Sequence, residues 1–138
     1  MVFVVDASIA AAWFLPDEQS EASDQVMAAL GKEAGCVPGL FWFETRNLFL
    51  TAERRGRLRA GEALLSMQQL RALPLREEPV DQDAFVLSLA QRRSLSGYDA
   101  SYLALALAQT LPLATTDQKL AAAARAEEVP VLGPLASS

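Results

Sequence analysis

The sequence predicts an α/β fold in which helices cover a parallel β-sheet. Short apolar runs alternate along the chain with longer segments of helical periodicity, and this alternation is typical of a parallel sheet whose strands are joined by helices. The first apolar run, residues 2–5, is continuous and rich in β-branched residues, so it indicates a strand that is buried on both faces. The length of 138 residues predicts one domain, 1–138, that can bury a large core.

Five short segments are predicted as strands and seven longer segments as helices. The predicted strands are apolar segments bounded by proline, glycine or polar residues: 2–5, 36–37, 73–77, 113–115 and 129–132. The predicted helices are segments whose apolar residues recur every three or four positions: 7–15, 18–32, 40–55, 59–73, 80–93, 96–109 and 118–126.

In the first half of the chain, proline and glycine set the limits of the helices. Pro16 ends the helix over 7–15, and Gly56 ends the helix over 40–55. The apolar residues of that second helix form one stripe: Phe41, Trp42, Thr45, Leu48, Phe49 and Ala52. Glu44 lies at the edge of this stripe. Four arginines lie in the connection to the next helix: Arg54, Arg55, Arg57 and Arg59.

In the second half of the chain, two helices begin next to polar residues. The helix that Ser96 opens is apolar on almost every side, so we expect it to be buried. Asp117 opens the last helix and lies just past the strand over 113–115. Pro74 interrupts the candidate strand over 73–77, which weakens the pattern there.

The composition excludes several classes of enzyme. The chain has no histidine, which rules out a Ser-His-Asp triad, a Cys-His pair and a zinc site built from histidine and cysteine. Any enzymatic chemistry must therefore use carboxylates, hydroxyls, lysine or arginine. The net charge of −5 argues against nucleic-acid binding by bulk attraction, although a bound metal and nearby basic residues would offset the charge of a site.

The sequence also predicts a cytoplasmic protein with no membrane partner. No apolar run reaches the ~20 residues of a membrane-spanning helix, and the first residues lack the basic segment of a signal peptide. Cys36 is the single cysteine, so an intrachain disulfide is excluded and nothing ties the fold to an oxidising compartment.

Four carboxylates stand where a parallel sheet gathers side chains. Asp6 ends the first strand and Asp117 follows a later one, and sites in open parallel sheets form outside the carboxyl ends of strands. Asp99 begins the buried helix, and Glu44 flanks the apolar stripe. If these acids converge, their mutual repulsion favours a divalent cation, and clustered carboxylates favour Mg²⁺ or Mn²⁺. Such a cation can activate water for attack on a phosphodiester.

Each of these acids also has a purely structural interpretation. Asp6 and Asp117 precede helices and can cap them, Asp99 follows Ser96 at the spacing of a weak capping box, and Glu44 can be a solvated acid. Four polar residues near the acids are candidates for support of the carboxylates, or else ordinary turn and capping groups: Ser8, Asn47, Thr115 and Thr116.

Four segments together resemble a known family: 4–8 (VVDAS), 44–47 (ETRN), 98–106 (YDASYLALA) and 114–120 (ATTDQKL). In their order, spacing and placement at strand ends and helix starts, they resemble the PIN-domain family, and in particular the VapC toxins of bacterial toxin–antitoxin pairs. The resemblance runs from residue 2 to about 132. It implies a three-layer α/β/α sandwich with a mostly parallel, roughly five-stranded sheet.

The resemblance implies a Mg²⁺- or Mn²⁺-dependent endoribonuclease that acts as the toxin of a type II toxin–antitoxin system. The matching positions for both catalysis and metal binding are four acids: Asp6, Glu44, Asp99 and Asp117. The resemblance further implies support from Ser8 and from Thr115 or Thr116. Lys119 stands where some relatives carry another acid, so a second metal site would be weak. A metal-activated water and the absence of histidine predict a 5′-phosphate and a 3′-hydroxyl on the products.

The partners that the resemblance implies are an RNA substrate, a VapB-type antitoxin and a second copy of the chain. Phe43 and Leu50 lie off the main stripe and are candidate interface residues, or they pack under the helix over 59–73. The arginines between the two helices are candidates for phosphate contacts, or a solvated flanking run.

Three different functions also stay open from the sequence. A receiver-like domain places an acid at the end of the first strand as well, but it needs a phosphoacceptor acid ending a central strand and a lysine ending a late one. The segment over 73–79 offers only Glu77 and Glu78, and Asp117 follows the late strand. A non-catalytic PIN-like binding module is the second possibility, and a housekeeping PIN nuclease of RNA maturation is the third.

Overall fold

The computed structural model describes residues 1–31 and 33–136, and within them five strands and seven helices are formed. The strands are β1 Val4–Val5, β2 Gly35–Val37, β3 Leu75–Glu77, β4 Leu113–Ala114 and β5 Val131–Leu132. The helices are α1 Ala7–Phe14, α2 Glu21–Ala28, α3 Leu40–Arg54, α4 Glu62–Arg71, α5 Asp83–Arg93, α6 Gly97–Gln109 and α7 Gln118–Ala126. No helix among the described residues is both long and apolar enough to cross a membrane.

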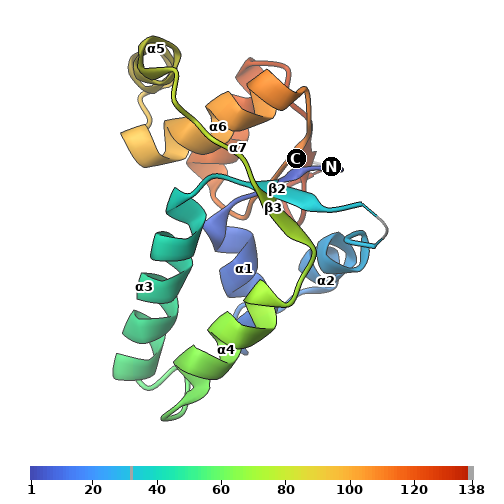
Figure 1. The fold of residues 1–138 in the computed structure, drawn as a ribbon, viewed down its shortest axis with the longest axis vertical. Coiled ribbons are helices and arrows are strands. Elements are labelled where there is room, and N and C mark those ends of the chain that lie inside the picture. Colours follow the sequence, from blue (N-terminus) through green and yellow to red (C-terminus); the bar gives the residue numbers. More distant parts are fainter. Residues whose placement is uncertain (32, 137–138) are drawn as a thin grey trace.

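The strands form one sheet in the order β3-β2-β1-β4-β5, and each pairing in the described chain is parallel. Helices α1 to α4 lie on one side of this sheet and α5 to α7 on the other (Figure 1). The predicted α/β fold with a five-stranded parallel sheet is therefore confirmed. Because the chain reverses its direction of travel across the sheet between β3 and β4, strands β1 and β4 become neighbours at a topological switch point.

The core is built from the apolar residues that the periodicity singled out. Val4 and Val5 are completely buried, as expected for a strand covered by helices on both faces. In α3, the stripe residues Phe41 and Phe49 are also fully buried. Helix α6 buries nearly all of its middle, Tyr102 to Ala106, which confirms the prediction from its all-round apolar character.

Three predicted helices begin three residues later in the structure than predicted: α2, α4 and α5, the last of which begins at Asp83 instead of residue 80. The helix predicted over 18–32 begins at Glu21, because the Ser20 hydroxyl accepts a hydrogen bond from the Ser23 backbone N–H and caps it. It ends at Ala28, and Lys32 lies outside the described residues. The helix predicted over 59–73 begins only at Glu62, because Gly61 has a φ of +86°, a left-handed conformation that no helix continues through.

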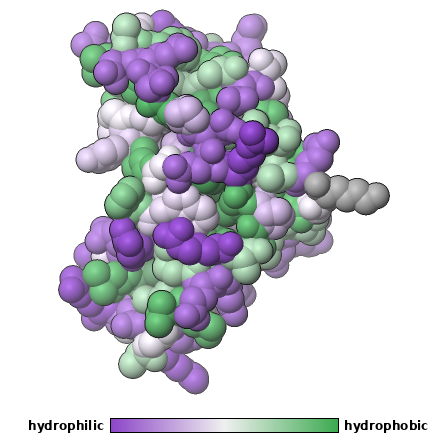
Figure 2. Space-filling model, viewed as in Figure 1, coloured by the Kyte–Doolittle hydropathy of each residue, from purple (hydrophilic) through white to green (hydrophobic). Residues whose placement is uncertain are grey.

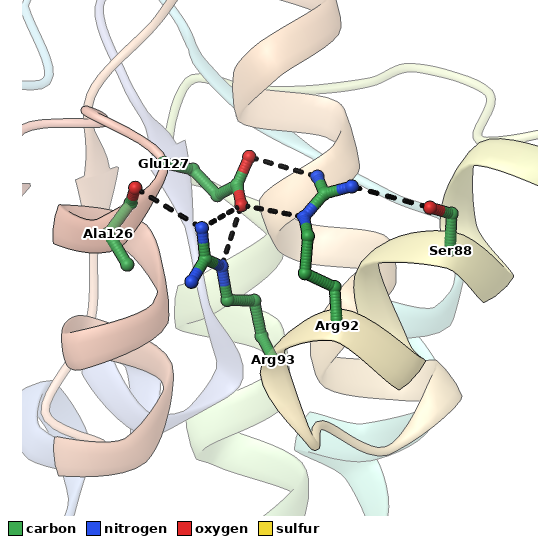
Figure 3. A network of polar contacts seen from close by, with 5 residues as sticks. All are labelled: Ser88, Arg92, Arg93, Ala126 and Glu127. Atoms are coloured by element: carbon green, nitrogen blue, oxygen red, sulfur yellow. Dashed lines mark hydrogen bonds and ion pairs between the residues drawn. The ribbon is translucent and has the colours of Figure 1, made fainter.

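An ion-pair cluster joins α5 to α7. Glu127, which follows α7, accepts hydrogen bonds from Arg92 Nε and Nη2 at 3.1 and 3.0 Å and from Arg93 Nε at 2.6 Å (Figure 3). The hydrogen bond from Arg92 is the largest influence on the pKa of Glu127 and lowers it; burial opposes this effect, but the net shift is downward. The cluster fixes the end of α5 just before the loop that leads into α6 and Asp99.

Candidate active site

The register of the central strands brings Asp6 and Thr115 to the same edge of the sheet. Val5 pairs with Ala114, and the Asp6 backbone N–H donates to the Ala114 carbonyl at 3.0 Å, so the next residues on each strand emerge side by side. The Thr115 hydroxyl donates to Asp6 Oδ2 at 2.7 Å, and the Ser8 hydroxyl donates to the same oxygen at 2.6 Å. The Asp6 side chain makes no capping hydrogen bond to α1, so the capping interpretation is wrong for this residue.

The two hydroxyls also tie the end of β4 to the end of β1. The Thr115 hydroxyl accepts a hydrogen bond from the Asp117 backbone N–H at 3.0 Å, and the Ser8 hydroxyl accepts one from the Thr116 backbone N–H at 2.9 Å. Of the two threonines that were candidates, Thr115 contacts the carboxylate through its hydroxyl, whereas Thr116 takes part through its backbone. This network fixes the orientation of the Asp6 carboxylate.

Asp117 has a structural role at the start of α7. Its Oδ1 atom accepts a hydrogen bond from the Leu120 backbone N–H at 2.9 Å, which is an N-cap. The capping interpretation is therefore confirmed for Asp117. The same cap holds this carboxylate at the carboxyl edge of the sheet, where its charge reaches Asp99 and raises the pKa of that acid.

Glu44 is held by a buried tyrosine from the opposite side of the sheet. The Tyr102 hydroxyl donates to Glu44 Oε1 at 2.6 Å, and Tyr102 itself is fully buried in α6. Glu44 is half-buried and lines two grooves, so it is only partly solvated. Tyr102 was missed in the sequence analysis, although a signal was present: it stands in the middle of an otherwise aliphatic stretch of helix, and a buried tyrosine hydroxyl requires a partner.

The pKa of Asp6 is strongly raised in the folded protein. Burial is the largest cause and raises its pKa from 3.8 to about 6, against the opposing hydrogen bonds from Ser8 and Thr115. The negative charges of Asp99 and Glu44 raise the pKa further. The negative charges of both helix acids, Glu44 and Asp99, therefore act on the Asp6 carboxylate.

The remaining acids interact with one another. Burial is the largest cause of the raised pKa of Glu44; the charge of Asp99 adds to it, while the hydrogen bond from Tyr102 lowers the pKa. Burial and then the charge of Asp117 raise the pKa of Asp99, while the positive charge of Lys119 lowers it. The structure therefore brings Asp6, Glu44, Asp99 and Asp117 into one electrostatically coupled cluster.

The chemistry of this cluster fits a hard divalent cation, although the carboxylates are not closed around one. Among the described residues, no group of three or more His, Cys, Asp or Glu side chains is placed so that it could hold a metal ion. Mg²⁺ usually takes only one or two carboxylates and keeps several waters. Repelling carboxylates with raised pKa values are the donors that such a cation stabilises.

Two grooves meet at Glu44. One, of about 360 Å³, runs along α3 and is lined by Ala7, Glu44, Asn47, Leu48, Thr51, Ala52 and Arg57. The other, of about 470 Å³, lies toward the start of α6 and is lined by Leu40, Phe43, Glu44, Asn47 and Tyr98. Asn47 lines both grooves. Among the described residues, however, no hydrogen bond joins its side chain to any of the four acids, so the prediction that Asn47 supports them rests on no direct contact.

Arg57 is the basic residue that lines the first groove. Its guanidinium forms a bidentate pair with Asp17 at 2.9 Å and also contacts Glu18. The pKa of Asp17 is lowered as a result, mainly by the hydrogen bond from Arg57. Arg57 therefore links the turn after α3 to the loop after α1, and its charge is balanced within the protein. The other three arginines of the run are exposed.

Replacing Tyr102 with Phe tests whether it positions Glu44. We expect the activity of this site to fall by roughly 10- to 100-fold, the usual effect of removing a group that orients a functional carboxylate. The loss of this hydrogen bond also raises the pKa of Glu44, so the rise of activity with pH should move to higher pH. Initial rates across a pH series measure both effects. Ser101→Ala is the matched control, since it removes the neighbouring hydroxyl of α6, which donates to the Gly97 carbonyl, and should leave the profile unchanged.

Comparisons with known proteins identify the family of this chain. The sequence profile of the PIN domain matches residues 3–126. Ribonuclease VapC3 of Pyrobaculum aerophilum is 35% identical to this chain over 126 residues, covering 88% of this chain and 93% of that protein. The receiver-like interpretation is set aside by the family match, and the sequence resemblance that pointed to PIN domains is confirmed.

Solved structures share the fold. The crystal structure of PAE2754 from Pyrobaculum aerophilum matches with a TM-score of 0.70 and 26% identity, covering 89% of this chain and 86% of that chain. A toxin–antitoxin complex from Klebsiella pneumoniae contains a chain that matches with a TM-score of 0.62 and 20% identity, covering 87% and 90% of the two chains. Taken with the profile match and the identity to VapC3, these findings show that the chain belongs to the PIN-domain family.

Proposed function

We propose that this protein is a metal-dependent endoribonuclease and the toxin of a type II toxin–antitoxin pair. The observation that carries the proposal is the coupled carboxylate cluster, Asp6, Glu44, Asp99 and Asp117, at the switch point of a PIN-domain sheet. The relative VapC3 is named a ribonuclease. A housekeeping nuclease would use the same site, and no contact within the described chain favours that role over the toxin.

A bound Mg²⁺ or Mn²⁺ would lower the pKa of a water molecule and would offset the negative charge of the transition state. Asp6, Asp99 and Asp117 are the candidates to hold this cation, one or two of them directly and the others through its bound waters, with Glu44 beside them. Ser8 and Thr115 keep Asp6 Oδ2 in a fixed orientation.

Glu44 is the residue that we expect to orient the attacking water. Its Oε1 atom is occupied by the Tyr102 hydroxyl, so the second carboxylate oxygen is the one that accepts a hydrogen bond from the water. Burial raises the pKa of Glu44 above its usual value, which makes the carboxylate a stronger base. We propose that the water attacks the phosphorus and that the 3′ oxygen leaves with a proton, so that the P–O3′ bond breaks and the products carry a 5′-phosphate and a 3′-hydroxyl.

The proposal includes a VapB-type antitoxin and a homodimer. Supporting the antitoxin is an apolar groove of about 340 Å³ between α3 and α4, lined by Arg46, Leu50, Ala63, Leu64, Met67 and Arg71. Leu64 is 65% exposed, and such an exposed patch is typical of an interface. Leu50 therefore lies partly against α4, as the packing interpretation predicts, whereas Phe43 lies outside this groove and is open to solvent.

Metal dependence is tested with labelled total RNA and purified protein. We expect the unchanged protein to cleave RNA with Mg²⁺ or Mn²⁺ and not with EDTA. We expect the Asp6→Asn and Asp99→Asn proteins not to cleave RNA even when the metal is present. The ends of the products are identified by adaptor ligation, because a 5′-phosphate and a 3′-hydroxyl can be ligated without prior treatment. Cutting that persists in EDTA or in either variant, or products with 2′,3′-cyclic phosphate ends, would contradict the mechanism.

A further inference from the structure

Two aromatic rings stand open to solvent beside the acid cluster. Phe43 is 65% exposed and Tyr98 is 67% exposed, although both belong to helices whose other faces are buried. Single exposed apolar residues are common on protein surfaces. Here, however, the two rings line the same groove of about 470 Å³, together with Leu40, Glu44 and Asn47. In Figure 2 the left outline of the molecule is indented between the α5–α6 pair and the beginning of α3.

The chain itself fixes the rings next to the acids. Phe43 immediately precedes Glu44 near the start of α3, and Tyr98 immediately precedes Asp99 in the first turn of α6. Glu44 and Asp99 are close enough for their charges to interact. A polynucleotide whose phosphate reached the carboxylates would therefore bring a neighbouring nucleotide over these rings.

The other groups at the groove suit a nucleotide better than a purely apolar segment of protein. Arg46 does not line this groove, but its guanidinium lies over one face of the Phe43 ring, 5.3 Å from the ring centre, and so places a positive charge next to the groove. The exposed Asn47 amide both donates and accepts hydrogen bonds, as the edge of a base requires. Unpaired bases stack on aromatic side chains and on arginine in single-stranded RNA recognition.

We propose that Phe43 and Tyr98 form a nucleobase subsite, in which an unpaired base of the RNA stacks beside the scissile phosphate. This inference rests on the proposed ribonuclease function and deepens it. The subsite selects single-stranded or looped RNA, because a base within a duplex cannot leave its stack without cost. Arg46 binds the phosphate that follows the stacked base, and Asn47 contacts the edge of the base.

The test measures RNA affinity in a background that does not cut. The Asp6→Asn protein is mixed, in Mg²⁺ and constant salt, with fluorescein-labelled single-stranded oligonucleotides of A, of C and of U, and anisotropy is recorded. Phe43→Ala and Tyr98→Ala are each expected to weaken binding by roughly 5- to 150-fold, the range that a stacked base gives. Phe43→Tyr and Tyr98→Phe keep a ring and should keep the affinity.

Two controls separate stacking from a general effect. Leu87→Ala removes a similarly exposed apolar side chain from α5 and should leave the affinity unchanged. An oligonucleotide of abasic ribose phosphates offers no base to stack. The Phe43→Ala and Tyr98→Ala proteins should therefore bind it as tightly as the protein that keeps both rings. When Asp6 is left unchanged, so that the protein can cut RNA, Phe43→Ala and Tyr98→Ala should raise the KM for RNA much more than they lower kcat.

Each remaining outcome counts against the subsite. If the protein with Asp6 cuts RNA but Phe43→Ala and Tyr98→Ala bind the labelled RNA normally, the subsite is wrong and the nuclease stands. If those variants convert a dimer to a monomer by light scattering without weakening RNA binding, the rings belong to an interface between copies. Normal RNA binding with weakened binding of the purified antitoxin assigns them to that partner. If the unchanged chain neither cuts nor binds RNA, the proposed function and the subsite fail together.

Discussion

Asp6→Asn is expected to abolish RNA cleavage and, at the same time, to stabilise the metal-free protein. Asp6 is 5% exposed, and its pKa in the folded protein is raised from 3.8 to about 6, with burial as the largest cause. At neutral pH the carboxylate is ionised at a cost to folding of about 3 kcal/mol. Asparagine carries no charge and its Oδ1 can still accept hydrogen bonds from Ser8 and Thr115, so this cost disappears.

The stabilisation should depend on pH in one direction. Between pH 3.8 and about pH 6 the unfolded chain loses the Asp6 proton before the folded protein does, so the stability of the unchanged protein falls as pH rises through this window. Below the window Asp6 is neutral in both states, and above it the difference is constant. The advantage of Asp6→Asn is therefore small at the acidic end of this window and reaches its full value near neutral pH.

Urea unfolding in EDTA at a series of pH values measures this advantage. Asp81→Asn is the matched control, because Asp81 is an exposed acid in the segment before α5 and its neutralisation should change stability little. An Asp6→Asn protein that is less stable than the unchanged one at neutral pH would show that the network around Asp6 needs its charge. In that case the loss of cleavage by this variant would no longer identify Asp6 as part of the active site.

Phe49→Ala is expected to lower the free energy of unfolding by about 3–5 kcal/mol, which is the usual cost of removing a fully buried phenylalanine. Phe49 is 0% exposed and packs edge-to-face on Phe14, with 5.9 Å between the ring centres. This contact joins α3 to α1 and so holds the helix that carries Glu44. The substitution leaves a cavity that the surrounding sheet and helices cannot fully close.

Phe43→Ala makes the same chemical change earlier on the same helix. Because Phe43 is 65% exposed, we expect its loss to change the free energy of unfolding by no more than about 0.5 kcal/mol. Urea unfolding of both variants gives the comparison. A large cost for Phe43→Ala would mean that its ring is covered, by a second copy of the chain or another contact, and would remove the premise of the nucleobase subsite. Equal costs for the two variants would contradict the packing of α3.

The elements that the sequence predicted well are those whose pattern is local. Helical periodicity repeats within one or two turns, so a short stretch of sequence predicts which faces of a helix are buried. This was the case for the apolar stripe of α3 and for α6, which is apolar on almost every side. Helix ends were predicted less well where a single backbone conformation decides them. Gly61 stops α4 from starting earlier, and its left-handed φ is not visible in a count of apolar residues.

The sequence by itself determined the fold class, the buried faces and, through resemblance, the identity of four candidate acids. The tertiary structure decided what each acid contacts. Thr115 meets Asp6 across 109 positions because β1 and β4 pair in one register, and Tyr102 meets Glu44 across 58 positions because α6 and α3 dock near the same edge. Such contacts depend on the register of the strands and on the packing of the helices. Both are set by interactions throughout the core, so a local sequence pattern does not reveal them.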